Sequence, residues 1–238
     1  MKETILTTED GIRISVNHYR NGFDRAIIIC PGFMMYKDSK PFSMLSERLN
    51  DEFDIITMDF RGHGKSSGLY TFTSREHLDL EAVVTYARKS YKDIGLMGFS
   101  LGAAIAINEA ASKRSVGKLM AVSSPTEFKK IENRFLDKAV LKATVKKFEW
   151  NMANVKLGNI LIEKPKPIDL VGRISPVPVL FVHGDRDTII NHNHSVSLYK
   201  KANEPKKLVV IKNGLHAEDL FFGNNFDDFI SLCIDWFK

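Results

Sequence analysis

The sequence predicts an α/β protein with a mostly parallel central sheet and helices on both of its faces. Short runs of apolar and β-branched residues recur from Ile5 to Ile211, and nearly continuous apolar runs are typical of parallel strands covered on both sides. Segments with helical spacing lie between these runs, and such strand–helix alternation is typical of this fold class. The 238 residues are enough for one domain with a sizeable core.

The individual elements follow from their periodicity. Ile12–Tyr19 alternates polar and apolar residues, which predicts a half-exposed antiparallel strand. The other predicted strands are Ala26–Cys30, Ile55–Met58, Ile94–Met97, Leu119–Val122, Val179–Val182 and Leu208–Ile211. The predicted helices are Pro41–Leu49, Arg75–Tyr91, Leu101–Ala111, His194–Ala202 and Phe226–Phe237, and Thr73 and Glu76 have the spacing of a capping box for the second of them.

One stretch interrupts this alternation. Residues 125–175 show helical periodicity and no convincing strand, and four prolines lie at their end and just beyond it. We therefore predict a core formed by residues 1–124 and 176–238, and a helical cap, or lid, formed by residues 125–175. The cap is inserted after the sixth strand, Leu119–Val122, when the run that begins at Ile5 is counted as the first. In open α/β sheets the site lies beyond the carboxyl ends of the strands, so this cap is positioned to cover it.

A candidate nucleophile lies at the end of one predicted strand. Gly98-Phe99-Ser100-Leu101-Gly102 fits the pattern G-x-S-x-G, directly after Ile94–Met97 and directly before an apolar helix. This strand–turn–helix context is what a nucleophile elbow requires, because the serine stands on a strained and crowded turn where the flanking positions have no room for side chains. The pattern predicts Ser100 as the nucleophile of a hydrolase.

A serine hydroxyl needs a neighbouring base to remove its proton. His216 follows the last predicted strand, where a catalytic histidine is expected, and His63 is the alternative, although its Arg-Gly-His-Gly context favours a rigid loop below the oxyanion hole. The acid is predicted to be Asp187, with Asp185 as the alternative. The chain order serine, aspartate, histidine is the one found in α/β hydrolases.

The carbonyl oxygen of a substrate becomes negatively charged during attack and needs prepared backbone donors. One predicted donor is the N–H of Leu101, at the start of the helix after the nucleophile. The other is the N–H of Phe33, in the loop Cys30-Pro31-Gly32-Phe33 after a predicted strand. Gly32 permits the close approach that this loop needs.

Taken together, the motifs resemble a known family over nearly the entire chain. The sequence is similar to compact, capped bacterial carboxylesterases of the α/β-hydrolase superfamily, of the feruloyl/cinnamoyl-esterase and monoacylglycerol-lipase type. The matching segments are Pro31-Gly32-Phe33, Asp59–Ser66, Gly98–Gly102, His183–Asp187 and Gly214–His216. In the family the later aspartate of the fourth segment is the triad member. Two positions depart from the family pattern, which usually has His in place of Pro31 and Gly in place of Leu215.

The resemblance implies a serine hydrolase that cleaves a carboxylic ester of a small molecule through an acyl-enzyme, with no metal and no organic cofactor. An acyl thioesterase with the same machinery is one alternative, and a ligand-binding or signalling protein with little turnover is another. His192 and His194 stand close together without carboxylate or cysteine company, so no metal site is predicted there. His183 is expected to end a strand with its ring satisfied by the backbone.

Within the cap, residues 135–148 predict an amphipathic helix. Leu136 and Val140 lie on its apolar face, which we expect to line the acyl or aryl part of the substrate pocket, with the lysines pointing outward. Residues 126–176 hold eleven Lys/Arg and six Asp/Glu, so they carry the whole net charge of +5. This excess favours a solvated helical face, and no nucleic-acid recognition motif accompanies it.

The remaining expectations concern location and assembly. The first residues contain no apolar stretch of the kind found in signal peptides, and no apolar run approaches the length of a membrane span. We expect a cytoplasmic protein without stable membrane insertion, and the sequence leaves homodimer formation open. Cys30 and Cys233 stand in apolar surroundings and are expected to be buried thiols.

Overall fold

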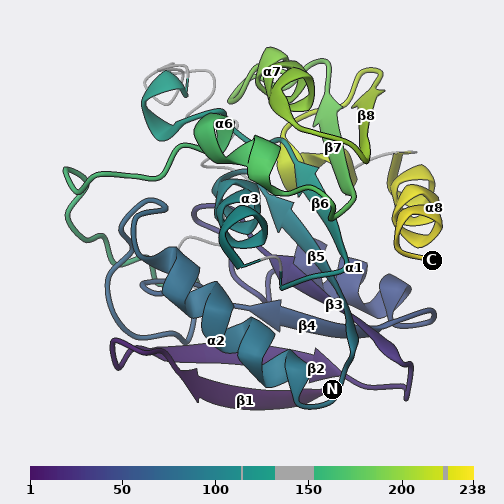
Figure 1. Ribbon diagram of the computed structural model, residues 1–238. Coiled ribbons are helices and arrows are strands. Elements are labelled where there is room, and N and C mark those ends of the chain that lie inside the picture. Colours follow the sequence, from purple (N-terminus) through teal and green to yellow (C-terminus); the bar gives the residue numbers. More distant parts are fainter. Residues whose placement is uncertain (114, 132–152, 222–224) are drawn as a thin grey trace.

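The sheet is mostly parallel, as predicted. The computed structural model describes residues 1–113, 115–131, 153–221 and 225–238 (Figure 1). Within these residues eight strands form one sheet in the order β1-β2-β4-β3-β5-β6-β7-β8. The strands are β1 (Lys2–Thr7), β2 (Arg13–Tyr19), β3 (Arg25–Cys30), β4 (Asp54–Met58), β5 (Asp93–Phe99), β6 (Lys118–Val122), β7 (Val179–Gly184) and β8 (Lys206–Ile211). The β1–β2 and β2–β4 pairs are antiparallel, and the others are parallel.

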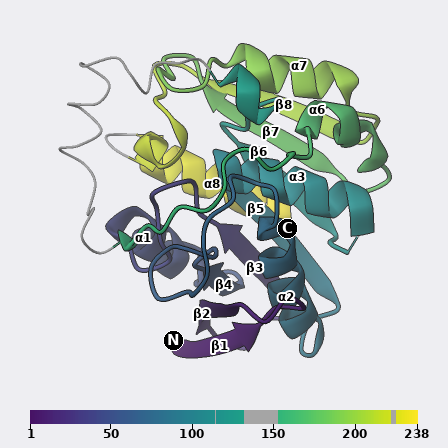
Figure 2. The ribbon, with the colours of Figure 1, turned by 90° about the vertical axis from the view of Figure 1, so that its left-hand side faces the viewer.

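Helices cover both faces of this sheet. The described α-helices are α1 (Lys40–Leu49), α2 (Glu76–Arg88), α3 (Leu101–Lys113), α6 (Pro167–Leu170), α7 (Asn193–Lys201) and α8 (Asn225–Phe237). Short 3₁₀ turns are η1 (Phe128–Lys130), η3 (Val171–Arg173) and η4 (Ala217–Phe221). Figure 2 shows the sheet between α2 and α3 on one side and α1 and α8 on the other.

The helices on the two faces of the sheet pack over separate apolar cores, because side chains of a strand alternate between the faces of a sheet. On β3, Ile28 packs in the core beneath α2 and α3. Its neighbours Ile27 and Ile29 pack in the other core, with residues of α1 and α8. All three side chains are fully buried, which explains why β3 reads as a continuous apolar run.

The predicted strands and helices are present in the described residues, with ends within three residues of those expected. The predicted capping box is wrong: α2 has Arg75 at its N-cap, with no side-chain hydrogen bond. The carboxylate of Glu76 instead accepts hydrogen bonds from the backbone N–H and the hydroxyl of Thr71. This local difference leaves the predicted fold class unchanged.

The predicted cap is described at its two ends. The amphipathic segment 135–148, with Leu136 and Val140, lies outside the described residues. After it, the backbone of Ala153 and Lys156 pairs with the loop that follows β4, through bonds from the N–H of Gly64 to Ala153 (2.7 Å) and from the N–H of Lys156 to Gly62 (2.8 Å). Farther on, Val171 is buried in the same core as α3, so this end packs with the sheet layers.

Two further expectations concern burial and membranes. Cys30 and Cys233 are both buried free thiols, as predicted. Among the helices in the described part of the chain, none is long and apolar enough to cross a membrane.

Candidate active site

Ser100 stands on a sharp turn between β5 and α3. Its φ is 53°, in the left-handed region that non-glycine residues seldom adopt. A Cβ at Gly98 would lie 2.6 Å from the Cα of Ala103, and one at Gly102 would overlap the carbonyl oxygens of Cys30 and Pro31. The two glycines are therefore needed for the tight approach of strand, turn and helix, as the elbow pattern predicts.

The structure brings Ser100, His216 and Asp187 together. The Ser100 Oγ lies 3.0 Å from the His216 Nε2, and the His216 Nδ1 lies 2.6 Å from the Asp187 Oδ2. Because a carboxylate only accepts, the Nδ1 of His216 carries the proton, and its Nε2 accepts the hydrogen bond of the serine hydroxyl. The alternative acid, Asp185, is exposed and has no side-chain bond to His216 in the described residues.

Both oxygens of the Asp187 carboxylate accept hydrogen bonds. Its Oδ1 accepts the backbone N–H groups of Ile189 and Ile190, both at 2.8 Å. Its Oδ2 accepts from His216 and also from the Nε2 of His183, at 3.0 Å. Burial alone would raise the pKa of Asp187, but the charge of His216 and the hydrogen bonds from both histidines hold that pKa well below its usual range.

The interaction between Asp187 and His216 shifts the pKa of His216 upward. Burial alone would lower the pKa of His216. The charge of Asp187 and its hydrogen bond, with smaller contributions from Glu218 and Asp219, raise that pKa above its ordinary value. In this arrangement the hydroxyl proton of Ser100 can move to His216, whose protonated form is stabilised by Asp187.

Two loops must approach closely to join the acid and the base. A Cβ at Gly184 would overlap the backbone of Gly214, and the N–H of Arg186 donates to the carbonyl of Gly214 at 2.9 Å. The Ser123 hydroxyl, at the end of β6, accepts the N–H of Ala217 at 3.0 Å. Three neighbouring strand ends thus fix the position of His216.

The loop after β3 lies against the nucleophile. A Cβ at Gly32 would lie 3.1 Å from the Cβ of Ser100, so the backbone of Gly32 and Phe33 runs beside the serine. Leu101, the other predicted donor, is the first residue of α3, where backbone N–H groups have no partner within the helix. The role of Phe33 and Leu101 as oxyanion donors stays a prediction.

His63 holds this loop and does not contact Ser100 in the described structure. Its Nε2 accepts the N–H of Met34 at 3.1 Å, and its Nδ1 donates to the carbonyl of Arg61 at 3.3 Å. Burial lowers the pKa of His63 to about 4, so the ring is neutral and can accept that bond. The carboxylate of Asp59 also joins the loop after β3 to the loop after β4, since it accepts hydrogen bonds from the backbone N–H groups of Lys37 (2.6 Å) and Lys65 (3.0 Å).

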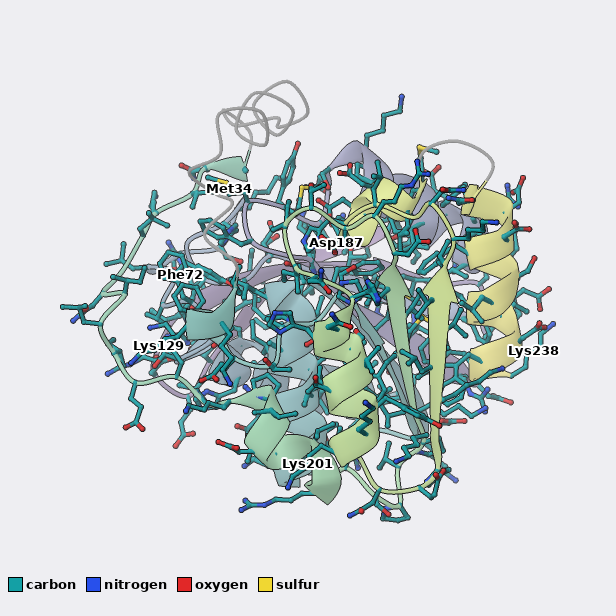
Figure 3. The ribbon with its side chains drawn as sticks, turned by 90° about the horizontal axis from the view of Figure 1, so that it is seen from above. Met34, Phe72, Lys129, Asp187, Lys201 and Lys238 are labelled. Carbon is teal, nitrogen blue, oxygen red and sulfur yellow. The ribbon has the colours of Figure 1, made fainter. Side chains whose placement is uncertain are left out.

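Aromatic rings extend from this loop to Phe128, which lies in the predicted cap. The ring of Phe33 stacks on Tyr70, with centroids 5.4 Å apart, and lies 5.2 Å from Phe72. Phe72 lies 5.3 Å from Phe128, in η1. Seen from above, Asp187 lies near the middle of the molecule, with Met34 and Phe72 toward one side (Figure 3).

The sequence did not predict three supporting contacts, which join His183 to Asp187, His183 to Ser195, and Ala217 to Ser123. The expected backbone partner of His183 is present, since its Nε2 lies 2.8 Å from the carbonyl oxygen of Ile190, and the ring also contacts Asp187 and the Ser195 hydroxyl. The bond from Ala217 to Ser123 was not foreseen. Two signals existed: His183 and Asp187 are four residues apart across a strand end, and Ser123 directly follows β6, which lies between the strands that precede Ser100 and Asp187. The described residues hold no cluster of three metal-ligating side chains.

Comparison with known proteins agrees with this fold. The family model described as alpha/beta hydrolase fold matches residues 25–172. The uncharacterized protein YfhR of Escherichia coli K12 is 25% identical over 202 residues, which cover 82% of this chain and 62% of YfhR. The uncharacterized protein Rv2307c of Mycobacterium tuberculosis is 24% identical over 229 residues, 91% of this chain and 73% of Rv2307c. The chain thus spans less than two thirds of the length of YfhR.

Solved structures show the same architecture. The Pyrococcus furiosus esterase Pf2001 superimposes with a TM-score of 0.81 at 24% identity, over 99% of this chain and 90% of that one. Est1E from Butyrivibrio proteoclasticus, solved with ferulic acid bound, gives a TM-score of 0.70 at 23% identity, over 98% and 95% of the two chains. Because the family model matches more than half of the sequence, the chain belongs to the alpha/beta hydrolase fold family.

Proposed function

We propose that this protein hydrolyses carboxylic esters through an acyl-enzyme on Ser100. The observation that carries the proposal is the continuous hydrogen-bonded row from the Ser100 hydroxyl through His216 to the buried Asp187, on a nucleophile elbow. This geometry supports activation of the serine by a general base whose tautomer is fixed by a carboxylate.

The reaction would proceed in two halves. The Ser100 Oγ attacks the ester carbonyl as its proton passes to the Nε2 of His216, and the backbone N–H groups of Phe33 and Leu101 stabilise the oxyanion. Collapse of the tetrahedral intermediate expels the alcohol, which takes the proton from His216. Water then attacks the acyl-enzyme with His216 again as base, and the acid and free Ser100 are released.

The named relatives support esters as the substrate class. Pf2001 and a structural neighbour from Thermogutta terrifontis, with a TM-score of 0.76 at 17% identity, are both described as esterases. The half-buried ring of Phe33, packed on the buried rings of Tyr70 and Phe72, provides an apolar surface beside the proposed oxyanion hole. A substrate with an apolar acyl or aryl group would fit this surface.

The pH profile is a first quantitative expectation. His216 can accept the serine proton only when neutral, so kcat/KM should fall as the pH drops through the pKa of His216. Because that pKa is raised, the midpoint should lie above the ordinary histidine value of about 6.5. Rates on a neutral ester between mildly acidic and mildly alkaline pH would measure it, and a midpoint well below the ordinary value would contradict this environment for His216.

We also propose that residues 125–175 act as a cap whose apolar side chains select the acyl group. Burying one such side chain contributes roughly 1.5–3 kcal/mol, so its truncation should change selectivity about tenfold. Leu136→Ala and Val140→Ala should shift the preferred acyl length, mainly through KM. Lys142→Gln is the matched control on the same segment and should leave the preference for neutral esters unchanged. An unaltered preference in folded alanine variants would refute the proposal.

A panel of nitrophenyl esters of increasing acyl length, with matched acyl thioesters, tests the proposed activity. Faster turnover of the oxygen esters is the expected result. A strong preference for thioesters would make the protein a thioesterase with the same machinery. Binding without turnover of either class would contradict the proposal and favour a ligand-binding role.

A further inference from the structure

His183 is a second histidine on the acid of the proposed triad. It lies near the end of β7, directly before Gly184, and is fully buried, and its Nε2 lies 3.0 Å from the same Asp187 Oδ2 that accepts the hydrogen bond of His216. The two rings thus approach one carboxylate oxygen, one from the loop after β8 and the other from β7 itself.

The protonation of this nitrogen follows from its partners. The Nε2 of His183 also lies 2.8 Å from the carbonyl oxygen of Ile190, and a carbonyl oxygen accepts hydrogen bonds only. The Nε2 therefore carries a proton, which is shared between Ile190 and Asp187. On the other side of the ring, the Nδ1 lies 2.7 Å from the hydroxyl of Ser195, in α7. A hydroxyl can donate or accept, so it suits both the neutral and the protonated ring, and the Nε2 donates to Asp187 in either state.

We propose that His183 is a positioning residue that tunes the proposed active site through Asp187. It fixes the carboxylate in the orientation that His216 requires, and its hydrogen bond draws negative charge away from the shared oxygen. The pull of Asp187 on the proton of His216 is thereby moderated, so that His216 releases the proton to the leaving alcohol more readily. The inference rests on the proposed function of Ser100, His216 and Asp187.

The neighbouring charges define what a change at His183 would do. Asp187 is influenced by His183 and His216, and His216 by Asp187, Glu218 and Asp219. Removal of the His183 donor leaves one donor on the Asp187 Oδ2 and strengthens its interaction with protonated His216. The pKa of His216 must then rise, and the acidic limb of the pH profile must move to higher pH.

Two substitutions separate positioning from packing. His183→Leu fills similar space without a donor, and should lower kcat by about tenfold or more while moving the acidic limb up by about half to one pH unit. His183→Gln places an amide N–H near the former Nε2 and should restore most of kcat and the original limb. His192→Leu, on the following loop, is the matched control. A folded His183→Leu enzyme with the wild-type limb would overturn the inference, as would equal losses in the leucine and glutamine variants without a shift.

A measurement on the unaltered protein avoids any effect of substitution on folding. In ¹⁵N-histidine NMR spectra, the Nε2 of His183 should remain protonated across the whole pH range of activity. An unprotonated Nε2, with the proton on Nδ1 alone, would overturn the inference. The proposed hydrolysis is tested separately by loss of activity in Ser100→Ala, so failure of either idea can be recognised without the other.

Discussion

Ser100→Ala should reduce ester hydrolysis by about six orders of magnitude in kcat, as in other hydrolases whose triad acts as a unit. The substitution removes the atom that would form the acyl-enzyme and the hydroxyl whose proton His216 would accept. A residual rate about 10³–10⁴ above water should persist, because the backbone donors and the binding surface remain. Initial rates on a nitrophenyl ester, with circular dichroism to confirm folding, provide the measurement.

Ser124→Ala is a suitable control for that experiment. Ser124 is also a buried serine at a strand end, but in the described structure its hydroxyl bonds only to the carbonyl of Pro125, at 3.2 Å. It should retain nearly full activity. If purified Ser100→Ala kept a rate comparable to the wild type, the proposed nucleophile would be wrong.

Asp187→Asn should lower kcat by about four orders of magnitude with little change in KM. The neutral amide loses the charge that stabilises protonated His216. Its NH₂ group, if turned toward the ring, favours the tautomer with the proton on Nε2, which cannot accept the proton of Ser100. Steady-state kinetics on the same ester would measure the loss, and the acidic limb should also shift because His216 no longer has its carboxylate partner.

Asp185→Asn provides the comparison within the same loop. Asp185 is exposed, whereas Asp187 is buried and accepts four hydrogen bonds. Its substitution should change kcat by less than about threefold, as is usual for surface positions away from such networks. A larger loss at Asp185 than at Asp187 would mean that the acid of the reaction is not the carboxylate bonded to His216.

Much of the fold was predictable because its signals are local. The apolar run at Ala26–Cys30 reflects a strand covered on both faces, and G-x-S-x-G reflects a turn where a side chain on either flank would overlap backbone atoms. The positions of Ser100, Asp187 and His216 follow from the same logic, since each stands in a loop at the carboxyl end of a parallel strand. Such ends lie at one edge of the sheet.

What the sequence could not provide are contacts between distant segments. Glu76 has the spacing of a capping-box residue, but its buried carboxylate binds Thr71 instead. The loop before α2 places the backbone N–H and the hydroxyl of Thr71 within hydrogen-bond distance of that carboxylate. The partners of His183 depend on how α7 places Ser195 against β7. Local spacing does not encode either contact.

The two departures from the family pattern also find an explanation. Leu215 is exposed, so the position before His216 has room for a side chain larger than that of glycine. Pro31 offers no polar side chain, and the loop that it begins is held by His63 at Met34 and by Asp59 at Lys37. The stability of this loop therefore depends on residues in the neighbouring segment after β4.

Trapping the covalent intermediate tests the central claim most directly. The protein would be mixed with an ester that acylates quickly and deacylates slowly, quenched in acid, and examined by intact-mass and peptide mass spectrometry. We predict an added mass of one acyl group less the hydrogen that it replaces, located on the peptide that contains Ser100 and absent from Ser100→Ala. Hydrolysis of the ester without such an adduct, or an adduct on another residue, would contradict an acyl-enzyme mechanism at Ser100.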